Sequence, residues 1–312
     1  MSSGVDSTPR VQGQLRCLLD NVQGLVDALT SVHWKKQQDA VCELSEHGIV
    51  ITVEEWGCMQ ARVFFRKELF RNYDYQLQGR SKFGVSLGLL VDSLNTFTSS
   101  SGTTALELRY PVDEMQLLLK LIDAHDTCIN AWISTRDPDT VPRDYSIEDI
   151  SAGLTPTSFA VKSAALKDAI EDLEWPGASI SLTMCPNPPR VIFKGEGHGD
   201  LEIQFLYNAQ ADLFIAFQCD REVSHKYKYK FLRATTANIP STILKDNRGS
   251  KVTIGSTGLL KVQHLISIRP TQTQQQQVDP NYNPQTQGGR VSYIEFYVLP
   301  EVEGDEETSP QH

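Results

Sequence analysis

Short runs of alternating apolar and polar residues recur along the chain and predict mostly β-strands. These runs are rich in β-branched and aromatic residues, and their alternation is typical of half-buried antiparallel strands. The clearest of them cover residues 49–53, 106–110, 179–183, 191–193, 201–205 and 292–298.

Three apolar stripes at helical spacing interrupt the strands and predict amphipathic helices. They lie at Val22–Val32, Leu87–Phe97 and Leu166–Leu173, and Asn21 is the expected N-cap of the first. A weaker fourth helix is expected within Ala234–Leu244, where Pro240 interrupts the pattern.

Segments without apolar periodicity divide the chain into two halves. Proline-rich and acidic residues mark a linker, and a run of glutamines marks a low-complexity loop. The expected organisation is a disordered tail at 1–13, a domain at 14–135, a linker at 136–157, a domain at 158–302 that contains the loop 271–289, and an acidic disordered tail at 303–312.

The two halves repeat the same order of predicted elements. Each begins with a strand and a helix, continues with several strands and a second strand–helix pair, and ends with more strands. The first helical stripes are offset by 144 residues, whereas the second helices match by position alone. This order predicts a tandem duplication of one α+β domain, with four helices presenting their polar faces on one surface.

Three stretches carry a resemblance to a known family. They are Leu19–Val22 before the first helix, Asp246–Gly249 before a strand, and Tyr293–Glu301, which combines the closing strand with the acidic tail. In this order of elements the chain resembles sliding clamps of the proliferating-cell nuclear antigen type. It is most similar to the Rad-one type subunit of the nine-one-one checkpoint clamp, over residues 14–302; the loop 271–289 has no counterpart in the family pattern.

The resemblance implies a sliding-clamp fold, with two tandem similar α+β domains that each pack two helices on antiparallel sheets. It also implies a heterotrimeric ring of related subunits around double-stranded DNA, opened and closed by an ATP-dependent loader. Checkpoint and repair proteins would dock on the outside of this ring, in the nucleus, and the chain itself would be no enzyme and need no cofactor. Because a closed ring is retained topologically, a few weak phosphate contacts suffice.

The formal net charge of −10 alone argues against a high-affinity DNA binder, since phosphate contacts need lysine and arginine. In the second half, family geometry makes five residues candidates to face DNA, with an ordinary solvated helix face as the alternative: Lys162, Lys167, Arg233, Lys245 and Arg248. The matching polar residues of the first helix are uncharged or acidic (Gln23, Asp27, Thr30 and Ser31), and only Lys35 and Lys36 follow.

The resemblance also places a peptide-docking pocket beneath the linker, with plain core packing as the alternative. Its expected residues are Ile49, Val50, Tyr297, Leu299 and Pro300. A second pattern, Lys226 to Phe231, alternates lysines with aromatic residues; we interpret it as a strand with one solvated and one buried face rather than a nucleic-acid patch.

Other chemistries find little support in the sequence. The glycine-rich stretch Gly195–Gly199 predicts a hairpin turn, because no helix follows to bind a phosphate. A metal-dependent exonuclease would need clustered carboxylates, and the best pairs, Asp200 with Glu202 and Asp172 with Glu174, have no third acid at a recognisable spacing. A protein-interaction scaffold without DNA stays open as a further alternative.

The six cysteines are scattered, with no C-x-x-C pair, and we expect reduced core residues rather than a metal site. No apolar stretch approaches the length of a membrane helix, and the first thirteen residues lack the pattern of a signal peptide. Both observations favour a protein that stays inside the cell.

Overall fold

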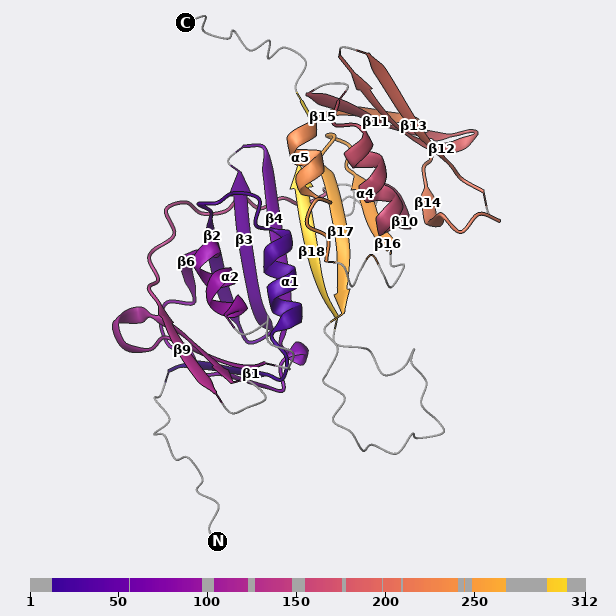
Figure 1. Ribbon diagram of the computed structural model, residues 1–312. Coiled ribbons are helices and arrows are strands. Elements are labelled where there is room, and N and C mark those ends of the chain that lie inside the picture. The colour runs from indigo at the N-terminus through magenta and orange to yellow at the C-terminus, as the bar shows by residue number, and fades with distance from the viewer. Residues whose placement is uncertain are drawn as a thin grey trace, which may run out of the picture.

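The computed structural model describes residues 13–55, 57–96, 104–122, 127–147, 155–175, 178–197, 199–208, 210–240, 244, 249–267 and 291–301. Within these ranges the chain forms two series of elements in the same order (Figure 1). The first series is β1 (Leu15–Leu19), α1 (Gln23–Ser31), β2 (Asp39–Ser45), β3 (Gly48–Glu55), β4 (Met59–Arg66), β5 (Asn72–Tyr75), β6 (Lys82–Ser86), α2 (Leu87–Asn95), β7 (Ala105–Tyr110), β8 (Leu117–Ile122) and β9 (Cys128–Ile133). The second is β10 (Thr157–Lys162), α4 (Ser163–Asp172), β11 (Ser179–Pro186), β12 (Pro189–Glu196), β13 (Asp200–Leu206), β14 (Phe214–Gln218), β15 (Val223–Lys228), α5 (Tyr229–Ala234), β16 (Gly249–Ile254), β17 (Leu260–Ser267) and β18 (Val291–Val298).

The sheets repeat as well as the elements do. In the first half, one sheet has the strand order β5-β1-β7-β8-β9, and the equivalent strands of the second half follow the order β14-β10-β16-β17-β18. The remaining strands form β4-β3-β2-β6 and β13-β12-β11-β15. Because β18 pairs antiparallel with β4, two of these four groups join into a nine-stranded sheet that runs through both halves. The predicted duplication is thus confirmed strand by strand.

The helices lie on one face of the nine-stranded sheet. In Figure 1, α1 and α2 lie in front of β2, β3 and β4, whereas α4 and α5 lie in front of the strands of the second half. Alternate strand residues point to this side, as the period of two requires, and they meet the apolar stripes of the helices in the core. Leu25, Val26 and Leu29 of α1 and Leu166 and Ile170 of α4 are buried there.

Polar side chains satisfy backbone groups where the first two helices begin. Asn21 was expected to be the N-cap of α1, but Val22 occupies that position. The Asn21 side-chain oxygen still accepts a hydrogen bond from the Gln23 N–H at 2.9 Å. At the start of α2, the Ser86 hydroxyl accepts from the Leu89 N–H at 3.4 Å. The first N–H groups of a helix have no partner inside it, so both contacts stabilise the helix start.

The fourth helix was expected in the wrong place. It occupies Tyr229–Ala234 rather than a position within Ala234–Leu244, and the strand expected up to Phe231 ends at Lys228. All three aromatic side chains of this stretch are buried. Tyr227 belongs to the end of β15, whereas Tyr229 and Phe231 belong to α5. The apolar alternation therefore continues across a change of backbone conformation.

The cysteines are free, and three of them, Cys17, Cys42 and Cys185, are buried as expected. Cys128 differs, because it is exposed on the edge strand β9. Among the helices of the described residues, none combines the length and apolar character needed to cross a membrane.

Candidate nucleic-acid interface and partner surface

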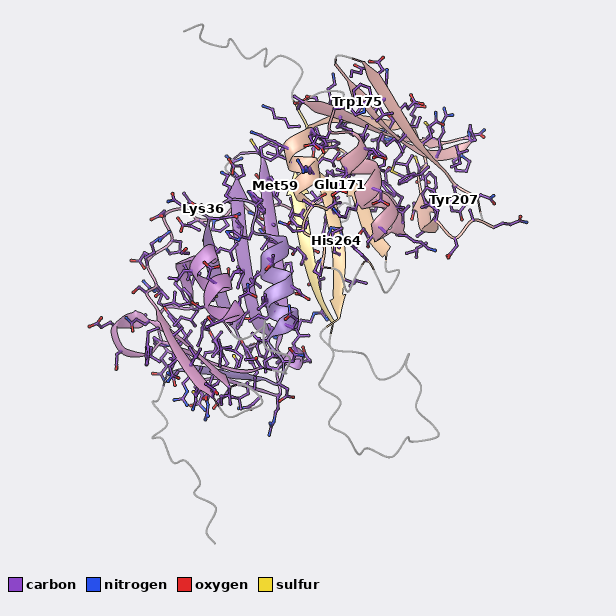
Figure 2. The ribbon with its side chains drawn as sticks, viewed as in Figure 1. Lys36, Met59, Glu171, Trp175, Tyr207 and His264 are labelled. Carbon is purple, nitrogen blue, oxygen red and sulfur yellow. The ribbon has the colours of Figure 1, made fainter. Side chains whose placement is uncertain are left out.

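The three predicted DNA-facing residues that the structure describes all lie at the helical surface of the second half. Lys162 ends β10 and forms an ion pair with Asp212. Lys167 on α4 pairs with Glu171 one turn later, the residue marked on that helix in Figure 2. Arg233 on α5 pairs with Glu174 at 2.8 Å. Each cation therefore has an acid beside it. Lys245 and Arg248 lie outside the described residues.

The helical surface as a whole is slightly acidic. Within the ranges of α1, α2, α4 and α5, five acidic residues stand against three basic ones, a net charge of −2: Asp27, Asp92, Asp168, Glu171 and Asp172 against Lys167, Lys230 and Arg233. Next to α1, Lys35 forms an ion pair with Glu55, and Lys36 is exposed. Among the described helices this acidic excess opposes phosphate binding, because such binding grows with the number of uncompensated cations.

A buried polar chain ties both helices of the second half to the sheet beneath them. His264 of β17 is fully buried (Figure 2), with its Nε2 at 2.7 Å from the Thr235 carbonyl that follows α5. Its Nδ1 lies 2.7 Å from the Ser250 hydroxyl, and Ser250 is bonded to Ser163 at the start of α4. Burial lowers the pKa of His264 to about 4, so its ring is neutral and can accept at one nitrogen and donate at the other.

The opposite, outer face of the nine-stranded sheet carries two of the predicted partner residues, Tyr297 and Val50. Tyr297 lies there with its hydroxyl donating to Glu295 at 2.7 Å, and Val50 lies on the same side. Ile49 does not, because neighbouring residues of a strand point to opposite faces. It lines the apolar space beneath α1 and α2 with Leu25 and Leu29, so its assignment to the pocket was wrong. Leu299 and Pro300 follow β18 and are partly exposed.

The segment after β9 already covers part of this outer face. Tyr145 stacks on Tyr297 with ring centroids 6.0 Å apart. The Arg143 carbonyl accepts hydrogen bonds from Gln60 at 2.9 Å and from Arg62 at 2.8 Å. Arg62 also lies over the Tyr297 ring, with its guanidinium carbon 5.7 Å from the centroid. Tyr297 is therefore already in contact with the chain's own Tyr145.

A scan against protein-family models finds that residues 14–266 match the model described as "Repair protein Rad1/Rec1/Rad17". The chain belongs to the Rad1 family. Several relatives match nearly the whole chain. "Cell cycle checkpoint protein RAD1" of Mus musculus is 26% identical over 296 residues, covering 91% of this chain and 91% of the relative. The human protein of the same name is 26% identical over 307 residues, covering 96% and 95%.

More distant comparisons agree with this assignment. "DNA repair protein Rad1" of Drosophila melanogaster is 22% identical over 306 residues, covering 96% of this chain and 99% of the relative. Among solved structures, PCNA from Thermococcus kodakaraensis superposes with a TM-score of 0.67 at 15% identity, covering 92% of this chain and all of that one. The Rad1 family member therefore has the sliding-clamp fold, and both the family and the fold class indicated by the sequence are confirmed.

The catalytic alternatives gain nothing from the geometry of this Rad1 family member. Asp200 and Glu202 of β13 lie on one face, as expected, but Glu202 faces Lys194 across the strands and accepts a hydrogen bond from Gln204. Among the residues whose positions are described, no three His, Cys, Asp or Glu side chains form a group that could hold a metal ion. The glycine-rich stretch joins β12 to β13 as a hairpin, with Glu196 paired to Asp200.

Sequence reasoning missed the residues that tie the linker to the outer face. Arg62 sits on a strand whose alternation predicts a solvated position, and Tyr145 lies in a segment without periodicity. An aromatic residue in an otherwise polar linker was the available signal, because a tyrosine ring gains stability when it packs on another ring.

Proposed function

We propose that this chain is one of three related but different subunits of a closed ring around duplex DNA. Its membership of the Rad1 family and its sliding-clamp fold support a role as a subunit of a DNA damage checkpoint clamp. In this proposal the ring acts in the nucleus as a platform for checkpoint kinase activators and repair enzymes, and an ATP-dependent loader opens and closes it. The chain itself performs no catalysis and binds no cofactor.

The strand pairing that joins the two halves of the chain is the observation that supports a ring. Inside the chain, the last strand of the second repeat, β18, pairs with the fourth strand of the first repeat, β4. The equivalent strands, β9 and β13, each form an outer edge of their own sheets. An edge strand presents unpaired backbone groups to another strand. Pairing β9 of one subunit with β13 of the next would thus repeat the contact that already joins the two halves.

This contact is heterologous, because two different surfaces meet head to tail. Such contacts produce closed rings when the rotation between subunits closes. Large apolar side chains stand on both edges: Trp132 on β9 is 59% exposed, and Leu206 at the end of β13 is also 59% exposed. Trp132 and Tyr297 occupy equivalent positions in the two repeats. Trp132 lies four residues before Arg136, whose backbone bonds to β6, and Tyr297 lies four residues before Glu301, whose backbone bonds to the equivalent strand β15. Trp132 would then be covered in the ring as Tyr297 is covered here.

In this ring the helical surface faces the DNA. Lys162, Lys167 and Arg233, together with Lys245 and Arg248, are the proposed DNA-facing residues. The nearby acids support weak contacts rather than tight binding, which suits a ring that is held by topology and must slide. Val50, Tyr297, Leu299 and Pro300 form the proposed partner surface on the outside, beside Tyr145.

We retain the organisation expected from the sequence as part of the proposal, with domains at 14–135 and 158–302, a linker at 136–157, and acidic residues at the C-terminal end. The linker at Arg143 and Tyr145 then bridges the outer face of a sheet to which both domains contribute.

The experiment that tests the ring is native mass spectrometry of the complex isolated from cells. We expect three different clamp-like chains in equal amounts. Substituting Trp132→Ala should release one partner subunit, because the side chain fills the contact at β9. Leu265→Ala is the matched control, since Leu265 is exposed to 52% but lies on β17, in the interior of the nine-stranded sheet and away from both edges. A monomer or homo-oligomer in the wild type, or equal effects of both substitutions, would contradict the proposal.

A further inference from the structure

The repeat provides a precedent for how a chain segment covers the outer face of a sheet. After β9, Arg136 pairs with β6: the Gly84 N–H donates to the Arg136 carbonyl at 2.8 Å, and the Arg136 N–H donates back at 3.1 Å. The following residues then cross the outer face as far as Tyr145. Beneath them Gln60 is completely buried and Thr52 nearly so, although both point away from the helices.

The chain leaves β18 in the same way. The Glu301 N–H donates to the Lys226 carbonyl of β15 at 2.7 Å, as Arg136 donates to Gly84 of β6. Lys226 and Gly84 are equivalent, because each lies three residues before the helix that follows its strand. The Glu301 carboxylate accepts a hydrogen bond at 2.8 Å from Ser179, whose side chain lies on the outer face of β11. Glu301 is therefore already fixed on the outer face of the four-stranded sheet.

Equivalent residues line the two outer faces, but within the described part of the chain only the first face is crossed by a further segment. Strand register relates the row Gly84, Val41, Thr52 and Arg62 of the first half to the row Lys226, Ser181, Lys194 and Glu202 of the second. The first row lies under the linker. In the second, Lys226 is exposed, and Ser181 and Lys194 are partly exposed.

The uncovered face is basic where it is nearest to Glu301. Lys226 and Lys228 lie on β15, beside the Glu301 contact, and Lys194 lies two strands further on. Lys226 takes part in none of the ion pairs formed among the described residues. The acids of this face are Glu196, which follows Gly195 opposite Ile180 and is held by Lys194 at 2.7 Å, and Glu202, which lies on the far strand, β13.

We propose that residues 302–312 bind across the outer face of the four-stranded sheet, as residues 137–147 cross the nine-stranded sheet. This segment carries Glu303, Asp305, Glu306 and Glu307 and no lysine or arginine. Its acids meet Lys226, Lys228 and Lys194 immediately after the Glu301 anchor. Tethering makes weak contacts sufficient, since the segment is held at a high local concentration. Because the contacts are ionic and lie at the surface, salt weakens them.

Carbodiimide cross-linking of the full chain tests this placement, because the reagent joins carboxylates only to amines in direct contact. We expect cross-links from Glu303 to Glu307 mainly to Lys226 and Lys194. Lys251, an exposed lysine on the outer face of β16, is the internal control. Cross-links spread evenly over exposed lysines, or formed mainly between mixed isotope-labelled copies, would overturn the proposal.

Amide hydrogen exchange gives an independent measurement. Replacing the four acids by Glu303→Gln, Asp305→Asn, Glu306→Gln and Glu307→Gln should speed exchange in β15 several-fold at low salt, with no change in β2 or β3. High salt should abolish the difference, since it releases the wild-type segment. Identical exchange in wild type and variant at low salt would overturn the proposal. Neither measurement requires a ring, so the outcome is independent of the proposed assembly.

Discussion

At the scale of single residues, ion pairing decides what the predicted cations can do. Lys167 and Glu171 are four residues apart on one helix, so their pairing follows from the sequence. The acids beside Lys162 and Arg233 are separated from them by 50 and 59 positions. No local pattern reveals such partners, because only the folded chain brings them together. The sequence could therefore predict which surface holds these cations, but it could not predict that acidic side chains distant along the chain pair with them.

His264 should make the stability of the protein depend on pH. Its folded-state pKa of about 4 lies below the ordinary value of 6.5. The neutral ring therefore stabilises the fold fully above pH 6.5, and this contribution is lost as the pH falls towards 4. The difference between these two pKa values corresponds to on the order of 3 kcal/mol of unfolding free energy. Urea unfolding at a series of pH values should show the loss, and His264→Gln should flatten it.

The matched control is His47→Gln, since the His47 side chain is exposed and takes no part in the buried chain around His264. Burial also lowers the pKa of His225, so the informative quantity is the difference between wild type and each variant. An unchanged slope between pH 6.5 and 4 in His264→Gln would show that the buried chain through Ser250 does not set this dependence.

At the scale of elements, most strands and three helices follow from the apolar period, whereas the fourth helix does not. Tyr227, Tyr229 and Phe231 alternate as in a strand, yet the chain turns into a helix at Tyr229. A short apolar run satisfies either period, and the packing of α5 on α4 and β15 decides between them. The linker was recognised by its composition, but its path over the sheet depends on contacts that no periodicity encodes.

The linker should be held mainly by its tyrosine. Tyr145→Ala removes the stacking on Tyr297, and ring pairs of this kind contribute about 0.5–1.5 kcal/mol beyond the area that they bury. We expect a loss of unfolding free energy of this size or somewhat more, together with faster amide exchange around Arg143. Val141→Ala, in the same linker at a side chain exposed to 82%, should be nearly neutral. Equal stabilities of the two variants would show that the stacking contributes little.

At the scale of the whole molecule, the three described candidates for DNA contact, Lys162, Lys167 and Arg233, are each paired with an acid, and the described helices carry an acidic excess. If Lys162, Lys167 and Arg233 face DNA, removing their partner acids should strengthen binding. We expect the triple substitution Asp212→Asn, Glu171→Gln and Glu174→Gln to tighten duplex binding at low salt. The slope of the logarithm of the binding constant against the logarithm of the salt concentration should become steeper by about 0.9 for each additional phosphate contact. Fluorescence anisotropy over a range of salt concentrations measures both quantities.

Glu43→Gln is the control for this experiment, because Glu43 is exposed on the outer side of the nine-stranded sheet. The reverse substitutions, Lys162→Glu with Lys167→Glu, should impair loading onto DNA and leave assembly intact. A triple variant that binds DNA with the wild-type salt dependence would remove these cations from the DNA-facing surface.

The pairing of β18 with β4 has a mechanical consequence. This junction is reinforced by the chain itself, since the linker crosses it and places Tyr145 on Tyr297 and the Arg143 carbonyl on Arg62. In the proposed ring, the corresponding junction between β9 of one subunit and β13 of the next would have no covalent connection across it. Each subunit should then move as one rigid body, and the proposed ring should open only at the contacts between subunits. In the proposed ring, force applied to one subunit would therefore open an edge contact without bending the two halves of the subunit apart.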